Sequence, residues 1–369
     1  MFVARRGVHN LQNMCLKDAR TVTQLAGRSF LPNSQSKNFP KYLKEASDNF
    51  PHVFKLHLKK VFKPELGKFG RSFRPILDKM VDKYGVVVLR GFNIDSAIPF
   101  SEFFQALGYP TMPYYSGTGV KGEVATSVAA PRSDPPICTV EPHNEMTYVK
   151  NSPDLVFLFN QITPARSCGG EVVLVDTRDI MHELEESVIN KFKRHGVRYY
   201  HHLPGEDSVF PSWQQAMQTS DRAEVERHLK AMDTQYVRWD EDGSLTYWTT
   251  QPAMVRHHKK GDMVWFNEAV SLHASHWRAH PKFAHIDLPE TRYPHTTLYG
   301  DGSQIESDVL QHIREVTWRN AVGTKLEKGD IMVLDNMYVQ HGRLGYSGQR
   351  LVLISLTRRD NGVDETDSD

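Results

Sequence analysis

Short apolar runs, most of them next to glycine, proline or polar residues, dominate the hydrophobic pattern of this chain. Runs of this length are typical of buried strands. The strands that they predict are 86–92, 155–159, 196–202 and 349–356, with more polar strands at 235–239 and 245–249. Three further runs, 169–176, 260–266 and 328–334, begin at a glycine turn and continue as strands. The pattern therefore predicts a protein that is mostly β.

Helical spacing of apolar positions occurs in fewer places. In the segment 73–84 apolar residues recur every three or four positions, with Ser72 placed to cap the helix and Gly85 to end it. Similar patterns predict helices at 100–107, 178–194, 211–218, 222–232 and 306–319, whereas the histidine- and proline-rich segment 279–301 is expected to be a loop. The pattern suggests a β-sandwich or jelly roll with flanking helices and a large mixed α/β insertion at about 177–320.

The two ends of the chain differ from the rest in composition. Segment 1–38 contains four arginines but a single acidic residue, Asp18, and it has no long apolar run. This composition is typical of an organellar transit peptide, and it fits a disordered extension equally well. We therefore expect one domain at 39–358, with an N-terminal extension and a disordered acidic tail at 359–369.

The amino-acid composition excludes several classes of binding partner. Lys and Arg total 45 against 44 Asp and Glu, so the formal net charge is only +1, which argues against nucleic acid or an anionic membrane as the partner. No apolar run is long enough to span a bilayer, and three widely spaced cysteines give no disulfide framework. We expect an intracellular protein, cytoplasmic or organellar, that acts on a small molecule.

Three residues could form a metal site. His143 and Glu145 stand two positions apart, so on an extended strand their side chains point to the same face. His341 lies far along the chain, and only a fold that returns could bring it close. Two histidines and one carboxylate leave one face of an octahedral metal open, as in non-haem Fe(II) oxygenases. Taken singly, a solvated pair on a strand edge and a core histidine are the more frequent explanations of these residues.

Two other features bear on cofactors. Arg350 opens the last apolar strand, and an arginine projecting from a strand into a pocket is suited to a bidentate grip on a carboxylate such as that of 2-oxoglutarate. Residues 117–122 contain a literal G-x-G-x-x-G, but prolines flank this segment and leave no room for the strand and helix of a dinucleotide site. A flexible loop near a site is the better interpretation.

The order of these motifs resembles the taurine dioxygenase family of Fe(II)/2-oxoglutarate-dependent oxygenases. It is most similar to the clavaminate synthase-like branch, which has Glu rather than Asp in the metal site. The matching motifs are His143-x-Glu145, Gly169-Gly170-Glu171, Lys328-Gly329-Asp330, Asp335-Asn336 with His341, and the following Arg350. Further matches at 84–92, 106–109, 264–267 and 300–302 extend the resemblance over roughly residues 73–356.

The resemblance implies a double-stranded β-helix, or jelly roll, and a set of site residues. His143, Glu145 and His341 would bind Fe(II), and Arg350 would bind 2-oxoglutarate, the cosubstrate used with O2. The family's other contact to 2-oxoglutarate is often a threonine hydroxyl, and Val172 occupies that position here.

The resemblance also narrows the reaction. Taurine dioxygenase has an arginine for its substrate's sulfonate where this chain has Ile354, and halogenating relatives lack the carboxylate that Glu145 supplies. The expected reaction is hydroxylation, desaturation or oxidative cyclisation of a small carboxylate-bearing metabolite such as an amino acid derivative, with release of succinate and CO2.

Candidates for substrate contacts, and two alternatives, remain open. The substrate candidates are Arg132, Asn267, Tyr114 and Tyr115. The surplus histidines (His201, His202, His257, His258, His273, His276) match no known metal-site spacing and are expected to be solvated. A non-catalytic metal or small-molecule binding module on the same fold is the main alternative, and a zinc hydrolase with the same triad is a weaker one.

Overall fold

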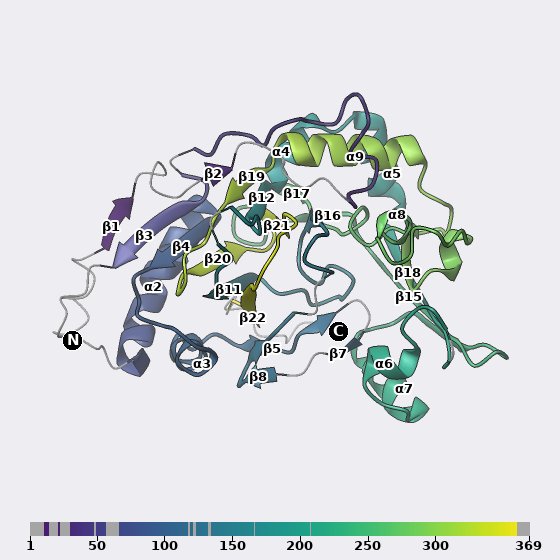
Figure 1. Ribbon diagram of the computed structural model, residues 1–369, viewed down its shortest axis with the longest axis horizontal. Coiled ribbons are helices and arrows are strands. Elements are labelled where there is room, and N and C mark those ends of the chain that lie inside the picture. The colour runs from purple at the N-terminus through teal and green to yellow at the C-terminus, as the bar shows by residue number, and fades with distance from the viewer. Residues whose placement is uncertain are drawn as a thin grey trace, which may run out of the picture.

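The structure is a computed structural model that describes residues 11–14, 21–22, 30–47, 49–56, 66–116, 119–120, 123–131, 134–165, 167–206 and 208–359. Most of the predicted N-terminal extension and all but the first residue of the predicted acidic tail lie outside these residues. No helix within these ranges is long and apolar enough to cross a membrane. The secondary structure is a mixture of β-sheets and helices (Figure 1).

The larger of two central sheets has nine strands in the order β1-β3-β4-β20-β11-β22-β9-β8, with β5 also paired to β22. These strands are β1 Leu11–Met14, β3 His52–Leu56, β4 Val86–Arg90, β5 Thr111–Met112, β8 Glu123–Ala125, β9 Val128–Ala129, β11 Leu155–Ile162, β20 Ile331–Asp335 and β22 Leu351–Thr357. The central strands β4, β11, β20 and β22 confirm the strands predicted in those places.

The second sheet has five strands in the order β10-β21-β12-β19-β2. They are β10 Val140–His143, β21 Val339–Arg343, β12 Val172–Asp176, β19 Val322–Thr324 and β2 Thr21–Val22. Strands β10 and β21 are antiparallel, and His143 lies directly opposite His341 in their register. Sheet pairing therefore joins two residues that the sequence separates widely.

Alternate residues of the central strands face two different cores. On β11, Val156 and Leu158 belong to the core that also contains Val173 and Val175 of the five-stranded sheet. Phe157, on the opposite face of β11, belongs to a second core. The larger sheet is therefore buried on both faces, which explains why its strands are apolar at nearly every position.

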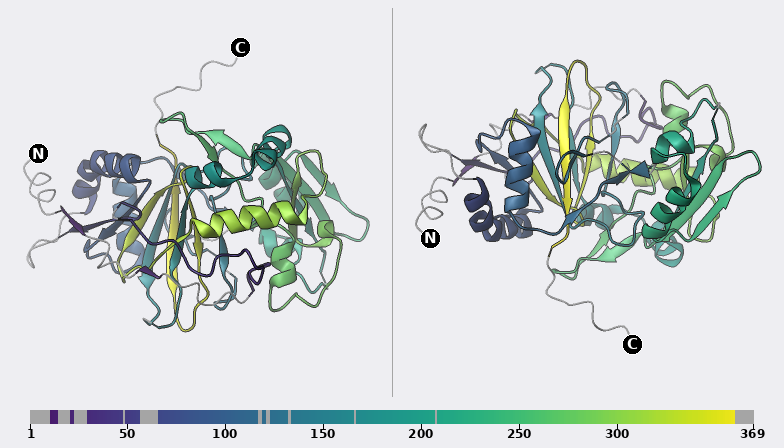
Figure 2. Two further views of the ribbon diagram at one scale, coloured as in Figure 1. Left: turned by 90° about the horizontal axis from the view of Figure 1, so that it is seen from above. Right: turned by 90° about the horizontal axis from the view of Figure 1, so that it is seen from below.

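Two helices cover the outer face of the larger sheet. They are α2 Leu66–Tyr84 and α3 Ala97–Ala106, and their buried phenylalanines, among them Phe73 and Phe103, form the second core. Both confirm helices predicted from the apolar spacing, although each begins several residues earlier than expected. Figure 2 shows these helices at one end of the molecule, with the central sheets beside them.

The predicted insertion contains a small sheet of its own. Its four strands run in the order β14-β15-β13-β18, with bounds β14 Tyr236–Trp239, β15 Leu245–Gln251, β13 Val197–Leu203 and β18 His295–Tyr299. Besides two helices described below, this part contains α6 Trp213–Met217, α7 Arg222–Ala231, α8 Ser275–Ala279, the 3-10 helix Glu290–Arg292, α9 Ser307–Arg319 and the hairpin of β16 Met254–Arg256 and β17 Met263–Trp265. This sheet lies at the end of the molecule opposite α2 and α3 (Figures 1 and 2).

Three sequence predictions are corrected. The helix expected at 178–194 is two helices, α4 Thr177–Glu183 and α5 Glu186–His195, because Leu184 adopts extended backbone with ψ 140°. The loop expected at 279–301 contains the buried strand β18. The loop expected at 114–122 contains the paired strands β6 Tyr115–Ser116 and β7 Gly119–Val120. Strand β18 was missed because polar residues occupy buried positions in it: Thr297 donates to the carbonyl of Ala269 and Thr296 accepts from the amide of Ala274.

Candidate metal centre and its cavity

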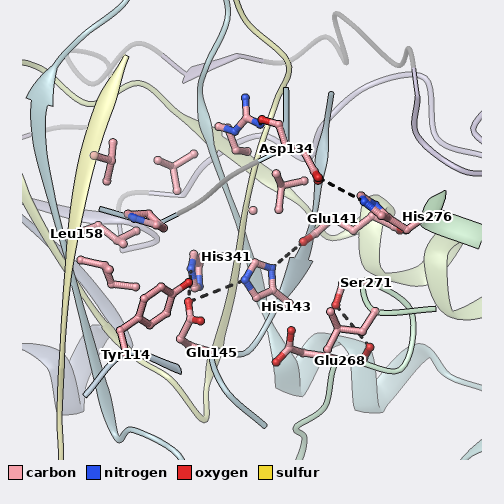
Figure 3. A pocket seen from close by; sticks show the side chains of 18 of the residues that line it. Tyr114, Asp134, Glu141, His143, Glu145, Leu158, Glu268, Ser271, His276 and His341 are labelled. Atoms are coloured by element: carbon pink, nitrogen blue, oxygen red, sulfur yellow. Dashed lines mark hydrogen bonds and ion pairs between the residues drawn. The ribbon is translucent and has the colours of Figure 1, made fainter. Parts of the chain in front are cut away.

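The structure brings His143, Glu145 and His341 together at one wall of a cavity (Figure 3). One donor atom from each residue lies within 4.8 Å of the other two. The Oε2 atom of Glu145 is 3.4 Å from Nε2 of His341 and 4.0 Å from Nε2 of His143. Two imidazole nitrogens and one carboxylate at these separations can share one metal ion.

Local hydrogen bonding orients the first imidazole. Nδ1 of His143 is 2.9 Å from the carbonyl oxygen of Glu141, so this nitrogen carries the proton and donates it, which leaves the lone pair on Nε2 facing Glu145. Burial, and next the neighbouring His341, lower the pKa of His143. The imidazole is therefore neutral at physiological pH, as a metal ligand must be.

The backbone of Glu145 is held by Asn336, which is fully buried. The Asn336 side chain accepts a hydrogen bond from the amide of Glu145 at 2.7 Å and donates to the carbonyl oxygens of Glu145 and Pro153, both at 2.9 Å. Asn336 stands between β20 and β21. It therefore ties the segment that carries Glu145 to the strand that carries His341.

The open side of the triad faces a cavity of about 330 Å³. On one wall, Arg350 donates from Nε to the carbonyl of Gly170 at 3.2 Å. Its two terminal nitrogens have no hydrogen-bond or ion-pair partner within the described part of the chain. Burial, and next the charge of Arg343, lower the pKa of Arg350 to about 10, so it remains charged at neutral pH. A buried guanidinium with free donors fits a carboxylate ligand.

Two neighbours of Arg350 shape the same wall. Val172 lines the cavity and offers no hydroxyl, as the sequence predicts. Arg343 donates to the carbonyl oxygens of Pro136 at 3.1 Å and Asp134 at 3.3 Å, which fixes the loop over the cavity. Arg343 stands two residues after His341 on β21, so the alternation of side chains along a strand was a signal for it in the sequence.

The other walls are aromatic and acidic. Tyr114 lines the cavity, and its hydroxyl donates a hydrogen bond to the carboxylate of Glu145. The Asp134 carboxylate is 3.3 Å from Nε2 of His276, and this imidazole holds the pKa of Asp134 at about 2 although burial acts in the opposite direction. Glu268 also lines the cavity. The sequence contained no periodic signal for Glu268, which lies on a loop after β17.

The other substrate candidates have different positions. Asn267 is absent from the main cavity lining; its side chain donates to the carbonyl of Ala253 and accepts from the amide of Ala269. Arg132 and the side chain of Tyr115 lie outside what the structure describes. Of the four candidates, the structure therefore brings only Tyr114 to the triad.

Four surplus histidines are buried rather than solvated, which corrects the expectation from sequence. They are His201, His202, His257 and His273. His201 stacks on Tyr247 with ring centroids 4.4 Å apart, and Nε2 of His257 is 3.1 Å from the carboxylate of Asp335. In the described ranges, the triad is the one group of three or more metal-ligating side chains close enough to hold an ion.

Comparisons with known proteins match most of the chain. Residues 54–357 match the family model described as taurine catabolism dioxygenase TauD, TfdA family. The dapdiamide synthesis protein DdaC of Enterobacter agglomerans is 26% identical over 288 residues, which cover 77% of this chain and 85% of that protein. A clavaminate synthase-like protein of Arabidopsis thaliana is 25% identical over 335 residues, covering 88% and 95% of the two chains. The crystal structure of PvcB from Pseudomonas aeruginosa aligns with a TM-score of 0.47 at 12% identity, covering 84% of this chain and 86% of that one.

Proposed function

Because this chain belongs to the TauD/TfdA family, and is therefore an Fe(II)- and 2-oxoglutarate-dependent dioxygenase, we propose that His143, Glu145 and His341 are its iron ligands. Fe(II), 2-oxoglutarate and O2 are its cofactors. The observation that supports the ligand assignment is the convergence of three donor atoms within 4.8 Å on one cavity. Arg350, whose terminal donors have no partner among the described residues, is the proposed contact to the distal carboxylate of 2-oxoglutarate.

The proposed reaction is hydroxylation, desaturation or oxidative ring closure of a small carboxylate-bearing metabolite such as an amino acid derivative, with release of succinate and CO2. The cavity, of about 330 Å³, supports a small substrate. The similarity to a dapdiamide synthesis protein and to a clavaminate synthase-like protein supports the same class. Ile354, in place of the arginine that binds a sulfonate, argues against taurine.

Bound iron supplies the oxidising chemistry, and the residues of the chain supply geometry. His143, Glu145 and His341 would hold the metal at the wall of the cavity. Arg350 fixes the orientation of the cosubstrate, and the Tyr114 hydroxyl steadies the carboxylate of Glu145. The buried apolar walls, among them Leu158 and Val352, keep water away from the reacting atoms.

The finer description of the fold is also a proposal. The nine-stranded and five-stranded sheets share one core, which supports a double-stranded β-helix as the centre of the molecule. The four-stranded sheet and its helices then form the insertion at about 177–320, within a single domain at 39–358.

One observation supports an alternative. Val172 has no hydroxyl where the family often has threonine, and this favours a module on the same fold that binds a metal or small molecule without catalysis. Such a protein would release no succinate with any substrate.

An anaerobic titration tests the proposal. Purified protein is loaded with Fe(II) and then 2-oxoglutarate, and the visible metal-to-ligand charge-transfer band is recorded. We expect a saturable band in the wild-type protein and its loss in His143→Ala, because a facial triad with one ligand missing binds iron weakly. His285→Ala, which changes an exposed histidine, is the control and should keep the band. Absence of the band from wild-type protein with iron bound would favour the binding module.

A further inference from the structure

Glu268 is a buried acidic side chain that the proposed iron and 2-oxoglutarate sites do not use. It is only 6% exposed, and it lines the same cavity as the triad. In Figure 3 its carboxylate lies on the side of His143 away from Asp134 and points into the cavity. It therefore borders the space left for a substrate.

A ring of hydrogen bonds fixes one oxygen of this carboxylate. The amide of Glu268 donates to the hydroxyl of Tyr199 at 3.0 Å, and that hydroxyl lies 2.9 Å from Oγ1 of Thr147. Thr147 in turn donates from its amide and its hydroxyl to Oε1 of Glu268, both at 3.3 Å. Thr147, which bonds the carboxylate, and Tyr199, which bonds Thr147 and the Glu268 amide, thus hold the side chain in one orientation.

The second oxygen has no such partner. Within the described part of the chain, Oε2 of Glu268 makes no hydrogen bond, and no lysine, arginine or histidine pairs with this carboxylate. The carboxylate of Glu145 is close enough to act on it electrostatically. A buried carboxylate without a cation is costly, and proteins rarely keep one that no ligand uses.

We propose that Glu268 binds a protonated amine of the substrate through Oε2. This inference rests on the proposed function, and it narrows the substrate class to small metabolites with a free ammonium group.

Two features support an ammonium over a neutral group. The cavity wall near Glu268 includes Tyr148, whose ring attracts a cation. Two other acidic side chains that line the cavity already have cationic partners: Asp134 pairs with His276 and Glu141 with Arg314. Glu268 is thus available for a ligand charge where Asp134 is not.

The test uses holoenzyme loaded with Fe(II) and 2-oxoglutarate without oxygen. The probes are L-ornithine, Nα,Nδ-diacetyl-L-ornithine, which has no free amine, propylammonium and propanol, and binding is read as a change in the charge-transfer band. We expect the free amines to bind and the matched neutral compounds to bind much more weakly. Glu268→Gln keeps the shape and removes the charge, and it should weaken binding of the amines roughly 30-fold or more.

Asp134→Asn is the matched control, because it removes a cavity carboxylate that already has a partner. It should preserve the preference for amines. The proposal is overturned if neutral probes bind as well as amines, if Glu268→Gln keeps the preference, if Asp134→Asn abolishes it, or if no amine binds while the band is intact. The wild-type comparison of amine with acetylated amine does not depend on how the variants fold. Loss of the band itself would overturn the proposed function, and this proposal with it.

Discussion

Single residues at the cavity differ in how much of their hydrogen-bonding capacity the protein uses. Both terminal nitrogens of Arg343 donate hydrogen bonds to loop carbonyl oxygens. In Arg350 only Nε donates one, to the carbonyl oxygen of Gly170. Both guanidinium groups line one cavity, and the pKa of each is lowered first by burial. The difference assigns a structural role to Arg343 and leaves Arg350 for a ligand.

The role of Arg350 can be measured by removing its charge. Arg350→Gln should raise the 2-oxoglutarate concentration for half-saturation of the charge-transfer band about 30-fold or more, because a buried bidentate partner of a carboxylate is lost. Iron binding, measured separately, should be unchanged. Arg227→Gln is the control, since its side chain is 68% exposed and far from any cavity residue in sequence. An unchanged half-saturation in Arg350→Gln would assign the cosubstrate to another group.

At the scale of elements, the site depends on how closely β10 approaches β21. Gly342 lies between His341 and Arg343, and a Cβ at this position would meet the carbonyl oxygen of Val140 at 2.6 Å. The nitrogen of Pro142 would be 3.0 Å away. A side chain here would push apart the two strands that carry the proposed histidine ligands.

Gly342→Ala should therefore lower both stability and iron affinity. We expect a loss of about 1–3 kcal/mol in the free energy of unfolding, because backbone atoms rather than a flexible side chain oppose the new methyl group. Denaturant titration and Fe(II) titration measure the two effects. Gly205→Ala is the control, since its nearest contact, the carbonyl oxygen of Gly243, is at 3.5 Å. Equal behaviour of the two variants would show that the strands tolerate separation.

The apolar pattern predicted the strands of the central sheets well. It failed where polar residues occupy buried positions, because such segments look like loops in the sequence. Strands β4, β11 and β20 are apolar on both faces, so their runs were unmistakable. Strand β18 reads as a loop because histidine and threonine occupy buried positions that hydrogen bonds satisfy. His143 and Glu145 could be paired from their spacing, whereas Glu268 depends on a loop position that only tertiary structure sets. His341 and Arg350 were candidates from their residue types and the strands beside them, and the resemblance to a family gave them specific roles.

At the scale of the whole molecule, the four-stranded sheet makes stability depend on pH. His201 and His295 lie opposite each other on β13 and β18. Burial, and next the mutual or neighbouring histidine charges, lower the pKa of His201 to about 3 and that of His295 to about 4. Below about pH 6.5 these two histidines bind protons in the unfolded chain but remain neutral in the folded chain. Lowering the pH therefore favours unfolding.

The free energy of unfolding should therefore fall between about pH 6.5 and pH 4, by about 1.4 kcal/mol per pH unit for each of these histidines. His201→Phe keeps a ring against Tyr247 and removes one titrating group, so it should make the dependence shallower. Denaturant unfolding at several pH values measures the slope. His285→Phe changes an exposed histidine and is the control, so it should leave the slope unchanged. A slope that His201→Phe leaves unchanged would contradict the assignment.

The register between His143 and His341 also sets when the metal site can exist during synthesis. Strand β21 lies near the C-terminal end of the described chain, and Asn336, which holds Glu145, immediately precedes it. A nascent chain still lacking this segment has only two of the three proposed ligands and no Asn336 beside Glu145. Iron capture by all three must therefore wait until His341 has been synthesised, so the metal cannot act as a nucleus for folding of the segments before it.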